Sequence, residues 1–183
     1  ARTDDLPLGK YYVVEKETAK GFVLDGEPRD IDLTYRDQDT PVVTYDSEWQ
    51  NSRQKAKVIV TKKEKDSDRT LEGAIFGLFA KEDIKSETTG KVLIEADEII
   101  ELKSTDEEGK ITFVADLPIG ATYYVKELYA PDGFVTNDEV KEFTFEYAGE
   151  DQPSVIYDFT FENQPTVVEF TKSSLTTGKE LPG

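Results

Sequence analysis

An internal repeat constrains the fold of this chain more than any other feature of its sequence. The stretch 5–15 returns at 116–127 with the same order of Leu-Pro, Gly, paired Tyr and a closing Glu. Asn51 likewise matches Asn163, which lies 112 positions later. Self-similarity at a fixed spacing is typical of one structural unit that occurs several times along a chain.

The chain is predicted to be out of phase with this repeat. Thr61-Lys62 returns near the C-terminus as Thr171-Lys172, 110 positions later. We therefore predict three parts. Residues 1–52 are the C-terminal half of one unit, residues 55–165 are a complete unit, and residues 166–183 are the opening strand of a third.

Hydrophobic and polar residues alternate through most of the chain, which is the period of a β-strand. Turn residues separate the alternating runs at the spacing expected of an antiparallel sandwich. Only residues 95–100 have a sequence that allows a turn or two of helix. The fold class is therefore predicted to be all-β. The predicted strands, rich in β-branched and aromatic residues, are 57–62, 74–79, 111–114, 123–127, 143–147 and 157–161.

The composition excludes most familiar enzyme chemistry. The chain has no His and no Cys, so it lacks the residues of Ser-His-Asp and Cys-His catalysis, of zinc fingers and of thiol redox sites. Asp and Glu outnumber Lys and Arg by 39 to 22, which gives a net charge of −17. This negative charge opposes binding to nucleic acid and to anionic lipid surfaces. We expect no nucleic acid partner, no membrane contact and no cofactor.

Two acidic motifs are better explained as exposed turns than as sites. Asp66-Ser67-Asp68 resembles the opening of a calcium loop, but Leu71 stands where that loop needs Gly and Gly77 where it needs Glu. The acidic runs 97–98 and 106–108 resemble the paired carboxylates of a glycosidase. Charge runs near Gly are typical of solvated turns. We expect neither a metal site nor turnover of an outside substrate.

Alternation places three polar side chains on the inward faces of predicted strands. Lys62 shares a face with Val58 and Val60, because residues two apart on a strand point the same way. The same count turns Glu127 and Asn163 inward, each with the aromatic side chains of its own strand. An amine, a carboxyl and an amide are therefore predicted to lie among aromatic rings.

Burial of an amine beside an acid favours the neutral form of both, because desolvation lowers the pKa of lysine and raises that of glutamic acid. A neutral Lys62 amine is a nucleophile, and a protonated Glu127 would hydrogen-bond to the Asn163 carbonyl and polarise it. The product would be an amide that joins Lys62 to Asn163, with release of ammonia. The alternatives are an ordinary buried Lys-Glu ion pair and strand-end side chains that turn to solvent.

Several motifs follow one another in a fixed order along the complete unit. They are Val60-Thr61-Lys62, Leu71–Leu78, Gly109–Phe113, Leu117–Gly120, Tyr123–Glu127, Ala130–Phe134 and Phe161–Asn163. This ordered set resembles the Cna-B, or SpaA-type, repeat domains of Gram-positive adhesins and pilins. The resemblance implies a reverse-immunoglobulin, prealbumin-like β-sandwich. It also implies an isopeptide bond between Lys62 and Asn163, with Glu127 as the catalytic acid. Glu15, Asn51 and Lys172 match the same roles in the partial units, but they lack their partners within their own units.

The resemblance implies an extracellular protein anchored to the cell wall of a Gram-positive bacterium. Backbone pilins of the family carry a lysine motif and a C-terminal LPxTG-like signal for sortase, and neither occurs in this sequence. We therefore expect a stalk module of a surface adhesin, stabilised against force and proteolysis, whose partners are neighbouring repeats of its own chain. The alternatives are a pilin shaft subunit and an adhesin module that binds a host protein or glycan.

The partial units lead to a second hypothesis. Residues 166–183 supply an opening strand with Val168, Phe170 and Lys172 on one face, and residues 1–52 lack such a strand. The tail of one molecule would then complete the head of another by strand addition. This pairing would bring Lys172 against Asn51. The alternative is loosely paired ends that do not associate.

Overall fold

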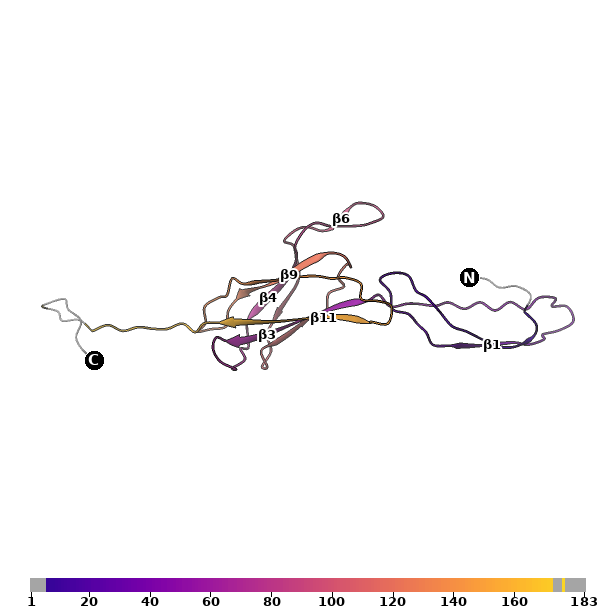
Figure 1. The fold of residues 1–183 in the computed structure, drawn as a ribbon, viewed down its shortest axis with the longest axis horizontal. Helices are drawn as coiled ribbons and strands as arrows, with labels where there is room; N and C mark the ends of the chain where they lie inside the picture. The colour runs from indigo at the N-terminus through magenta and orange to yellow at the C-terminus, as the bar shows by residue number, and fades with distance from the viewer. Residues whose placement is uncertain (1–5, 173–175, 177–183) are drawn as a thin grey trace.

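The computed structural model describes residues 6–172 and Thr176, and this part of the chain is built from β-strands without a helix. The molecule is elongated, with β1 toward one end and residues 166–172 extending from the other (Figure 1). The predicted all-β class is confirmed. The strands are β1 (Gly9–Val13), β2 (Arg29–Leu33), β3 (Lys55–Glu64), β4 (Ile75–Ala80), β5 (Ile84–Lys85), β6 (Val92–Ile94), β7 (Ile99–Ser104), β8 (Lys110–Phe113), β9 (Thr122–Tyr129), β10 (Val140–Thr144) and β11 (Ser154–Asn163).

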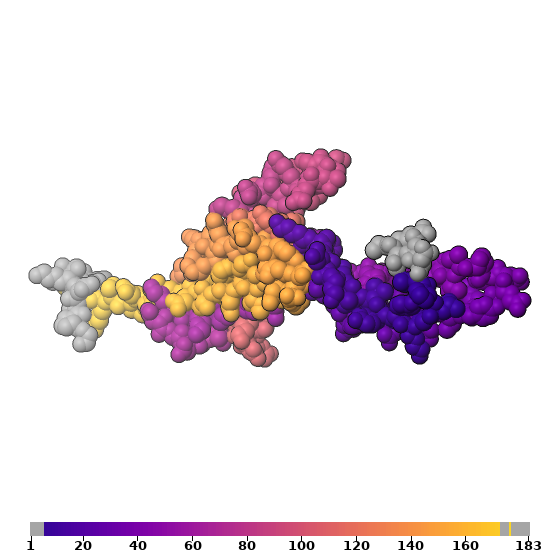
Figure 2. All heavy atoms as spheres, turned by 45° about the vertical axis from the view of Figure 1, so that its right-hand side comes forward, coloured from indigo at the N-terminus to yellow at the C-terminus, as the bar shows by residue number. Residues whose placement is uncertain are grey.

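Strands β3 to β11 form a sandwich with a small arm. One sheet has four strands in the order β10-β9-β4-β7, and the other has three in the order β11-β3-β8. β5 and β6 pair only with each other, in an arm that projects from the sandwich (Figure 2). The side chains enclosed between the two sheets include Val58, Val60, Phe76, Leu78, Ile111, Phe113, Tyr123, Val125 and Phe161.

The first and last strands of the sandwich lie side by side and run parallel. β11 pairs with β3 from Ser154 opposite Lys55 to Asn163 opposite Glu64. β8 pairs with β3 in the antiparallel direction, and every pair in the four-stranded sheet is antiparallel too. The parallel pair therefore brings the entry strand and the exit strand of the unit together, which alternation alone does not predict.

All six predicted strands are present, with shifted ends. The largest shift is in β10, which runs from Val140 to Thr144 where the sequence predicts 143–147. Residues 95–100 do not form a helix: Asp97 adopts a φ of 61° in a turn, and β7 begins at Ile99. Along β3, burial alternates as predicted, because each second side chain faces the opposite sheet.

The first unit has the strand register of the complete unit. Tyr11 of β1 pairs with Ile31 of β2, and Tyr123 of β9 pairs with Phe143 of β10. Each member of the second pair lies 112 positions after its counterpart in the first. The sequence repeat is therefore also a repeat of backbone pairing.

The ends of the two units are paired alike as well. Phe22 forms an isolated bridge with Arg53, and Phe134 forms one with Pro165, again 112 positions later. Residues 166–172 form no strand, and most of the predicted third part, 173–175 and 177–183, lies outside the described residues. The boundaries 1–52, 55–165 and 166–183 stay predictions.

A buried glutamine connects the first unit to the sandwich. Gln54 is 1% exposed and directly precedes β3. Its Nε2 donates to the carbonyl oxygens of Gly149 and Gln152 at 3.0 and 2.6 Å, and its Oε1 accepts the N–H of Ala148 at 2.9 Å. Leu24 of the first unit donates its backbone N–H to the same loop at 2.9 Å. These bonds join the two units end to end.

Gly109 holds the backbone of Lys62 in place. Its carbonyl accepts the Lys62 N–H at 2.7 Å, its φ is 69°, and a Cβ there would lie 2.7 Å from the Lys62 oxygen. We expect Gly109→Ala to lower the free energy of unfolding by about 3 kcal/mol, because a left-handed residue costs roughly 1–2 kcal/mol and the backbone clash adds to it. Denaturant titration measures this loss.

Gly120→Ala is the matched control. Gly120 has a φ of 86°, but nothing lies within 4 Å of an added Cβ. This variant should lose only the conformational part, about 1–2 kcal/mol. Equal losses in the two variants would contradict the close approach at Gly109.

Candidate functional site

Lys62 is a lysine with no exposed surface. Its exposed fraction is 0%, and it lies near the end of β3 with Phe161 of β11 opposite it. Asn163, 1% exposed, follows Phe161 by two residues and so points to the same face of the sheet. The parallel pairing of β3 and β11 therefore directs Lys62 and Asn163 into the same part of the core.

Glu127 reaches this pair from the opposite sheet. It lies in β9, and its side chain is fully buried. Its Oε1 is 3.3 Å from Lys62 Nζ, and Asn163 Nδ2 donates to both carboxyl oxygens at 3.0 Å. The backbone N–H of Asn137 donates to Oε2 at 2.7 Å. One carboxyl group thus contacts both the amine and the amide across the sandwich, and the predicted inward orientation of all three side chains is confirmed.

Aromatic rings exclude water from the site. Lys62 Nζ lies 5.8 Å from the ring centroid of Phe76, and the rings of Phe76 and Phe161 are 4.9 Å apart. Neither ring is exposed. In such surroundings an isolated charge is strongly disfavoured, so the amine is either paired or neutral.

The surroundings of Lys62 make its amine easier to deprotonate. Burial lowers the pKa of Lys62 from its ordinary value, and attraction to the Glu127 carboxylate opposes this shift only in part. A lysine with a lowered pKa has more of its neutral, nucleophilic form at a given pH than an exposed lysine. The site therefore holds a lysine suited to attack a carbonyl carbon.

Two atoms of the site are buried without a hydrogen bond. They are Lys62 Nζ and Asn163 Oδ1. Nζ is within ion-pair distance of Glu127 but makes no hydrogen bond with good geometry. An unsatisfied buried polar group costs about 1–3 kcal/mol, and such groups are rare in native proteins unless they have a role such as catalysis.

The amide of Asn163 faces Glu127 with its nitrogen. The sequence led us to expect that Glu127 hydrogen-bonds to the Asn163 carbonyl, and this detail is wrong. Asn163 Nδ2 donates to the carboxyl group, whereas Oδ1 has no partner. Since Nδ2 is the atom that would leave as ammonia, Glu127 lies where an acid would protonate the leaving group.

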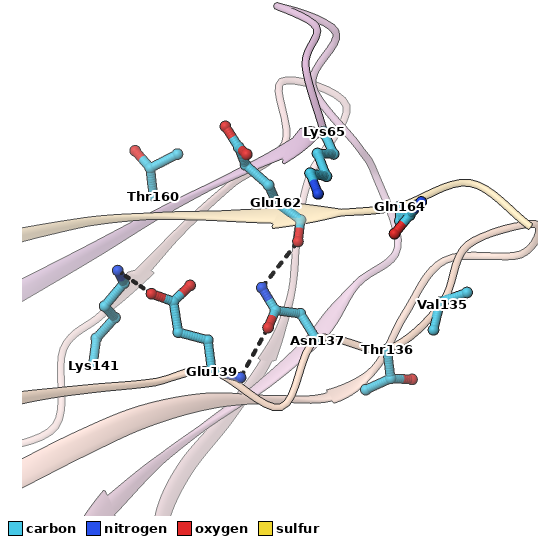
Figure 3. A pocket seen from close by; sticks show the side chains of 9 residues that line it. All are labelled: Lys65, Val135, Thr136, Asn137, Glu139, Lys141, Thr160, Glu162 and Gln164. Atoms are coloured by element: carbon cyan, nitrogen blue, oxygen red, sulfur yellow. Dashed lines mark hydrogen bonds and ion pairs between the residues drawn. The ribbon is translucent and has the colours of Figure 1, made fainter.

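Asn137 supports Glu127 and was not anticipated from the sequence. Its Nδ2 donates to the carbonyl oxygen of Glu162 at 2.9 Å, and its Oδ1 accepts the N–H of Glu139 at 2.8 Å (Figure 3). These bonds direct the Asn137 N–H at Glu127. The polar pocket beside the buried site is lined by Lys65, Val135, Thr136, Asn137, Glu139, Lys141, Thr160, Glu162 and Gln164. Two of these lining residues, Glu139 and Lys141, form an ion pair with each other.

The first unit has similar contacts around a glutamate and an asparagine, which are partly rather than fully buried. Asn51 Nδ2 donates to Glu15 Oε1 at 2.7 Å and to Thr18 Oγ1 at 2.5 Å, and the Asp25 N–H donates to Glu15 Oε2 at 3.1 Å. Asn51 Oδ1 is buried and unpaired, as Asn163 Oδ1 is. Asp25 follows Glu15 by 10 positions, and Asn137 follows Glu127 by 10 positions. This equal spacing is the signal in the sequence that points to the role of Asn137.

The predicted site residues are thus divided among three places. Lys62, Glu127 and Asn163 meet in the core, and Glu15 meets Asn51 in the first unit. Within the described residues no lysine forms an ion pair with Glu15. Lys172 is exposed and belongs to the segment 166–172, which extends from the end of the molecule opposite β1 (Figure 1).

The described residues show no group of three or more side chains that could hold a metal ion. In the same part of the chain, no helix is long and apolar enough to cross a membrane.

Comparison with known proteins identifies relatives of the sandwich. The model of the family described as SpaA, prealbumin-like fold domain, matches residues 56–160. The Bacillus anthracis TIE protein is similar over 97% of this chain and 32% of its own, with 23% identity and a TM-score of 0.57. No curated protein matches the chain.

Two pilin structures are also similar. The full-length major pilin SpaD of Corynebacterium diphtheriae matches over 60% of this chain and 32% of its own, with 22% identity and a TM-score of 0.43. The shaft pilin spaA of Lactobacillus rhamnosus GG matches over 87% of this chain and 66% of its own, with 16% identity and a TM-score of 0.46. The chain spans about a third of the length of the first two solved structures. The likeness to the TIE protein, at 23% identity, is a likeness of fold.

Proposed function

Because the chain belongs to the SpaA family of prealbumin-like fold domains, we propose that it is a structural stalk module of a Gram-positive surface protein. In this proposal an amide bond between Lys62 and Asn163, made by the chain itself, stabilises the module. The observation that carries the proposal is the contact of Glu127 with both Lys62 Nζ and Asn163 Nδ2, where all three side chains are buried from solvent. The module acts by resisting force and proteolysis, and its reaction occurs once per molecule.

The reaction needs three side chains, and the carboxyl group of Glu127 contacts the other two. A proton moves from Lys62 Nζ to the Glu127 carboxylate, 3.3 Å away, and this leaves a neutral amine and a neutral acid. Nζ attacks Asn163 Cγ, and the bond from Cγ to Nδ2 breaks. Glu127 donates its proton to Nδ2, to which it is hydrogen-bonded at 3.0 Å. The second proton lost by the attacking amine also passes through the carboxyl group to the leaving nitrogen, so this nitrogen departs as ammonium and Glu127 ends as the carboxylate with which it began.

The reaction also relieves the cost of burying the free amine. Before the reaction, Lys62 Nζ is buried without a hydrogen bond. In the product, Nζ is part of a neutral amide with a single N–H, which Glu127 is placed to accept. The neutral product is compatible with the rings of Phe76 and Phe161, whereas a lone ammonium is not.

The position of the bond suits a module under tension. Lys62 and Asn163 lie on β3 and β11, the first and last strands of the sandwich. Tension along the chain enters through β3 and leaves through β11, so a covalent link between them carries the load past the rest of the sandwich. The hydrogen bonds of Gln54 at the junction support an arrangement of successive units in a line. We propose that the neighbouring units of the same chain are the main partners of the module, on the outer surface of the cell.

Peptide mapping tests the cross-link. Digestion of the denatured chain should release one branched peptide that joins the β3 segment at Lys62 to the β11 segment at Asn163. Lys62→Ala should remove this peptide. Lys63→Ala should keep it, because Lys63 is partly exposed and pairs with Asp68. Two separate linear peptides from the wild-type chain would contradict the proposal.

A further inference from the structure

We propose that Asn137 is a positioning residue for the cross-link, and that it makes the reaction depend on the docking of β11. Its side chain takes the place of a backbone N–H in the pairing with β11, which leaves its own N–H to hold the carboxyl group of Glu127. This inference rests on the proposed function, because it names a residue that prepares that reaction.

The loop between β9 and β10 runs along the end of β11 and the residues that follow it. Thr166 donates its N–H to the Gly133 oxygen at 2.8 Å, and Val135 donates its N–H to the Gln164 oxygen at 2.9 Å. The two pairs are two residues apart on both segments and run in opposite directions, as in an antiparallel ladder. The register therefore places a further pair two residues along.

Asn137 and Glu162 form this next pair, and here a side chain replaces the backbone. Asn137 Nδ2, rather than the backbone N–H, donates to the Glu162 oxygen at 2.9 Å (Figure 3). The neighbouring carbonyl of Asn163 points the other way, to the N–H of Lys65 at 2.9 Å, as carbonyls alternate along a strand. The pairing with β11 is thus satisfied without the backbone N–H of Asn137.

The N–H that is released in this way binds Glu127. It donates to Oε2 at 2.7 Å, which is at the short end of the range for N–H donors and is typical of a carboxylate acceptor. The other oxygen, Oε1, lies 3.3 Å from Lys62 Nζ. The bond from Asn137 therefore fixes the rotation of the carboxyl group, so that one oxygen faces the amine that it deprotonates.

The Oδ1 atom of Asn137 keeps the loop in this shape. It accepts the N–H of Glu139 at 2.8 Å, which is an Asx turn. The first unit has the same turn, since Asp25 Oδ1 accepts the N–H of Glu27 at 3.3 Å and the Asp25 N–H donates to Glu15. An aspartate can therefore form the turn, but its carboxylate cannot donate to a carbonyl oxygen. This difference separates the turn from the bond to β11.

Asn137 connects the strand that carries the acceptor amide to the acid that acts on it. Its partner Glu162 directly precedes Asn163 on β11. Before β11 is in place, Nδ2 has no acceptor on that strand, and the N–H is not held toward Glu127. The reaction is thereby restricted to chains in which β11 has docked.

Asn137→Asp tests this role, since it keeps the turn and loses the donor to β11. The full chain is made by cell-free translation, and samples are denatured at intervals and weighed intact. Asn137→Asp should lose its ammonia about tenfold or more slowly than the wild type, because a misplacement of about 1 Å costs about 100-fold in rate. The neutral Asn137→Ala, which lacks both bonds, should be at least as slow. Gln164→Ala should match the wild type, since Gln164 pairs through its backbone.

A nuclear magnetic resonance signal separates positioning from a purely structural role. In an Asn163→Ala background, which cannot react but keeps Lys62 beside Glu127, the amide proton of residue 137 should lie far downfield because a carboxylate binds it. Asn137→Asp should move this signal upfield. The melting temperature of that background should fall by less than about 8 °C, which corresponds to the loss of one hydrogen bond.

Equal rates in the wild type and Asn137→Asp, or an unmoved signal of residue 137, would overturn the role of Asn137. A slow reaction that accompanies a much larger fall in melting temperature would also overturn it, because the residue would then act only through the fold. A wild-type chain that loses no ammonia would instead overturn the proposed cross-link itself, and the role of Asn137 would fall with it.

Discussion

Glu127→Gln should leave the sandwich without its cross-link and lower its melting temperature by about 20 °C or more. Glutamine has the shape of glutamate but cannot accept the lysine proton or protonate the leaving nitrogen, so the reaction stops. The bond closes a loop of about 100 residues, for which the chain-entropy model of cross-links gives about 4.7 kcal/mol. For a domain of this size, each kcal/mol corresponds to roughly 4–8 °C. Calorimetry measures the shift.

Glu139→Gln is the matched control for this prediction. It makes the same change of charge, but Glu139 is partly exposed and pairs with Lys141 at the pocket outside the core. It should keep the cross-link and melt within a few degrees of wild type, since surface ion pairs contribute about 0–1 kcal/mol. If Glu127→Gln retained the bond, the assignment of Glu127 as the acid would be wrong.

Under mechanical force, the extended length of the wild-type sandwich should differ clearly from that of a variant without the cross-link. When the chain is pulled from both sides of the sandwich, the wild type should not release the residues between Lys62 and Asn163. Asn163→Ala should release them, and this adds roughly 350 Å of length at 3.3–3.6 Å per residue. The reason is that a covalent bond between β3 and β11 carries the load, whereas hydrogen bonds and packing yield. Single-molecule force spectroscopy measures the added length.

Thr160→Ala serves as the control in the pulling experiment. Thr160 lies on β11 but is exposed on the other side of the strand from the site. This variant should extend like the wild type. Full extension of the wild-type sandwich would contradict the proposed role of the module under tension.

Much of the fold was predictable because its signals are local. Period-two alternation located the main strands and turned Lys62, Glu127 and Asn163 inward, since a strand fixes the face of each side chain. The repeat assigned Glu15 and Asn51 to the positions of Glu127 and Asn163, but the hydrogen bond between them was not predicted. The roles of these residues in a reaction stay predictions.

Features that depend on distant contacts were not predictable in this way. The parallel pairing of β3 with β11 leaves no mark on the alternation of either strand. β5 and β6 are too short to give a period, and β7 begins in a stretch whose Ile99-Ile100 also suits a helix. The amide orientation of Asn163 and the support from Asn137 follow from loop geometry and hydrogen bonds that form only in the folded chain.

The most direct test of the cross-link is the intact mass of the denatured chain. The wild type should be lighter than its sequence by the mass of one ammonia. Lys62→Ala, Asn163→Ala and Glu127→Gln should each have the full mass of their own sequences. A wild-type mass equal to that of the unmodified sequence would contradict the account, because it would leave a free lysine amine and a free asparagine amide in the core.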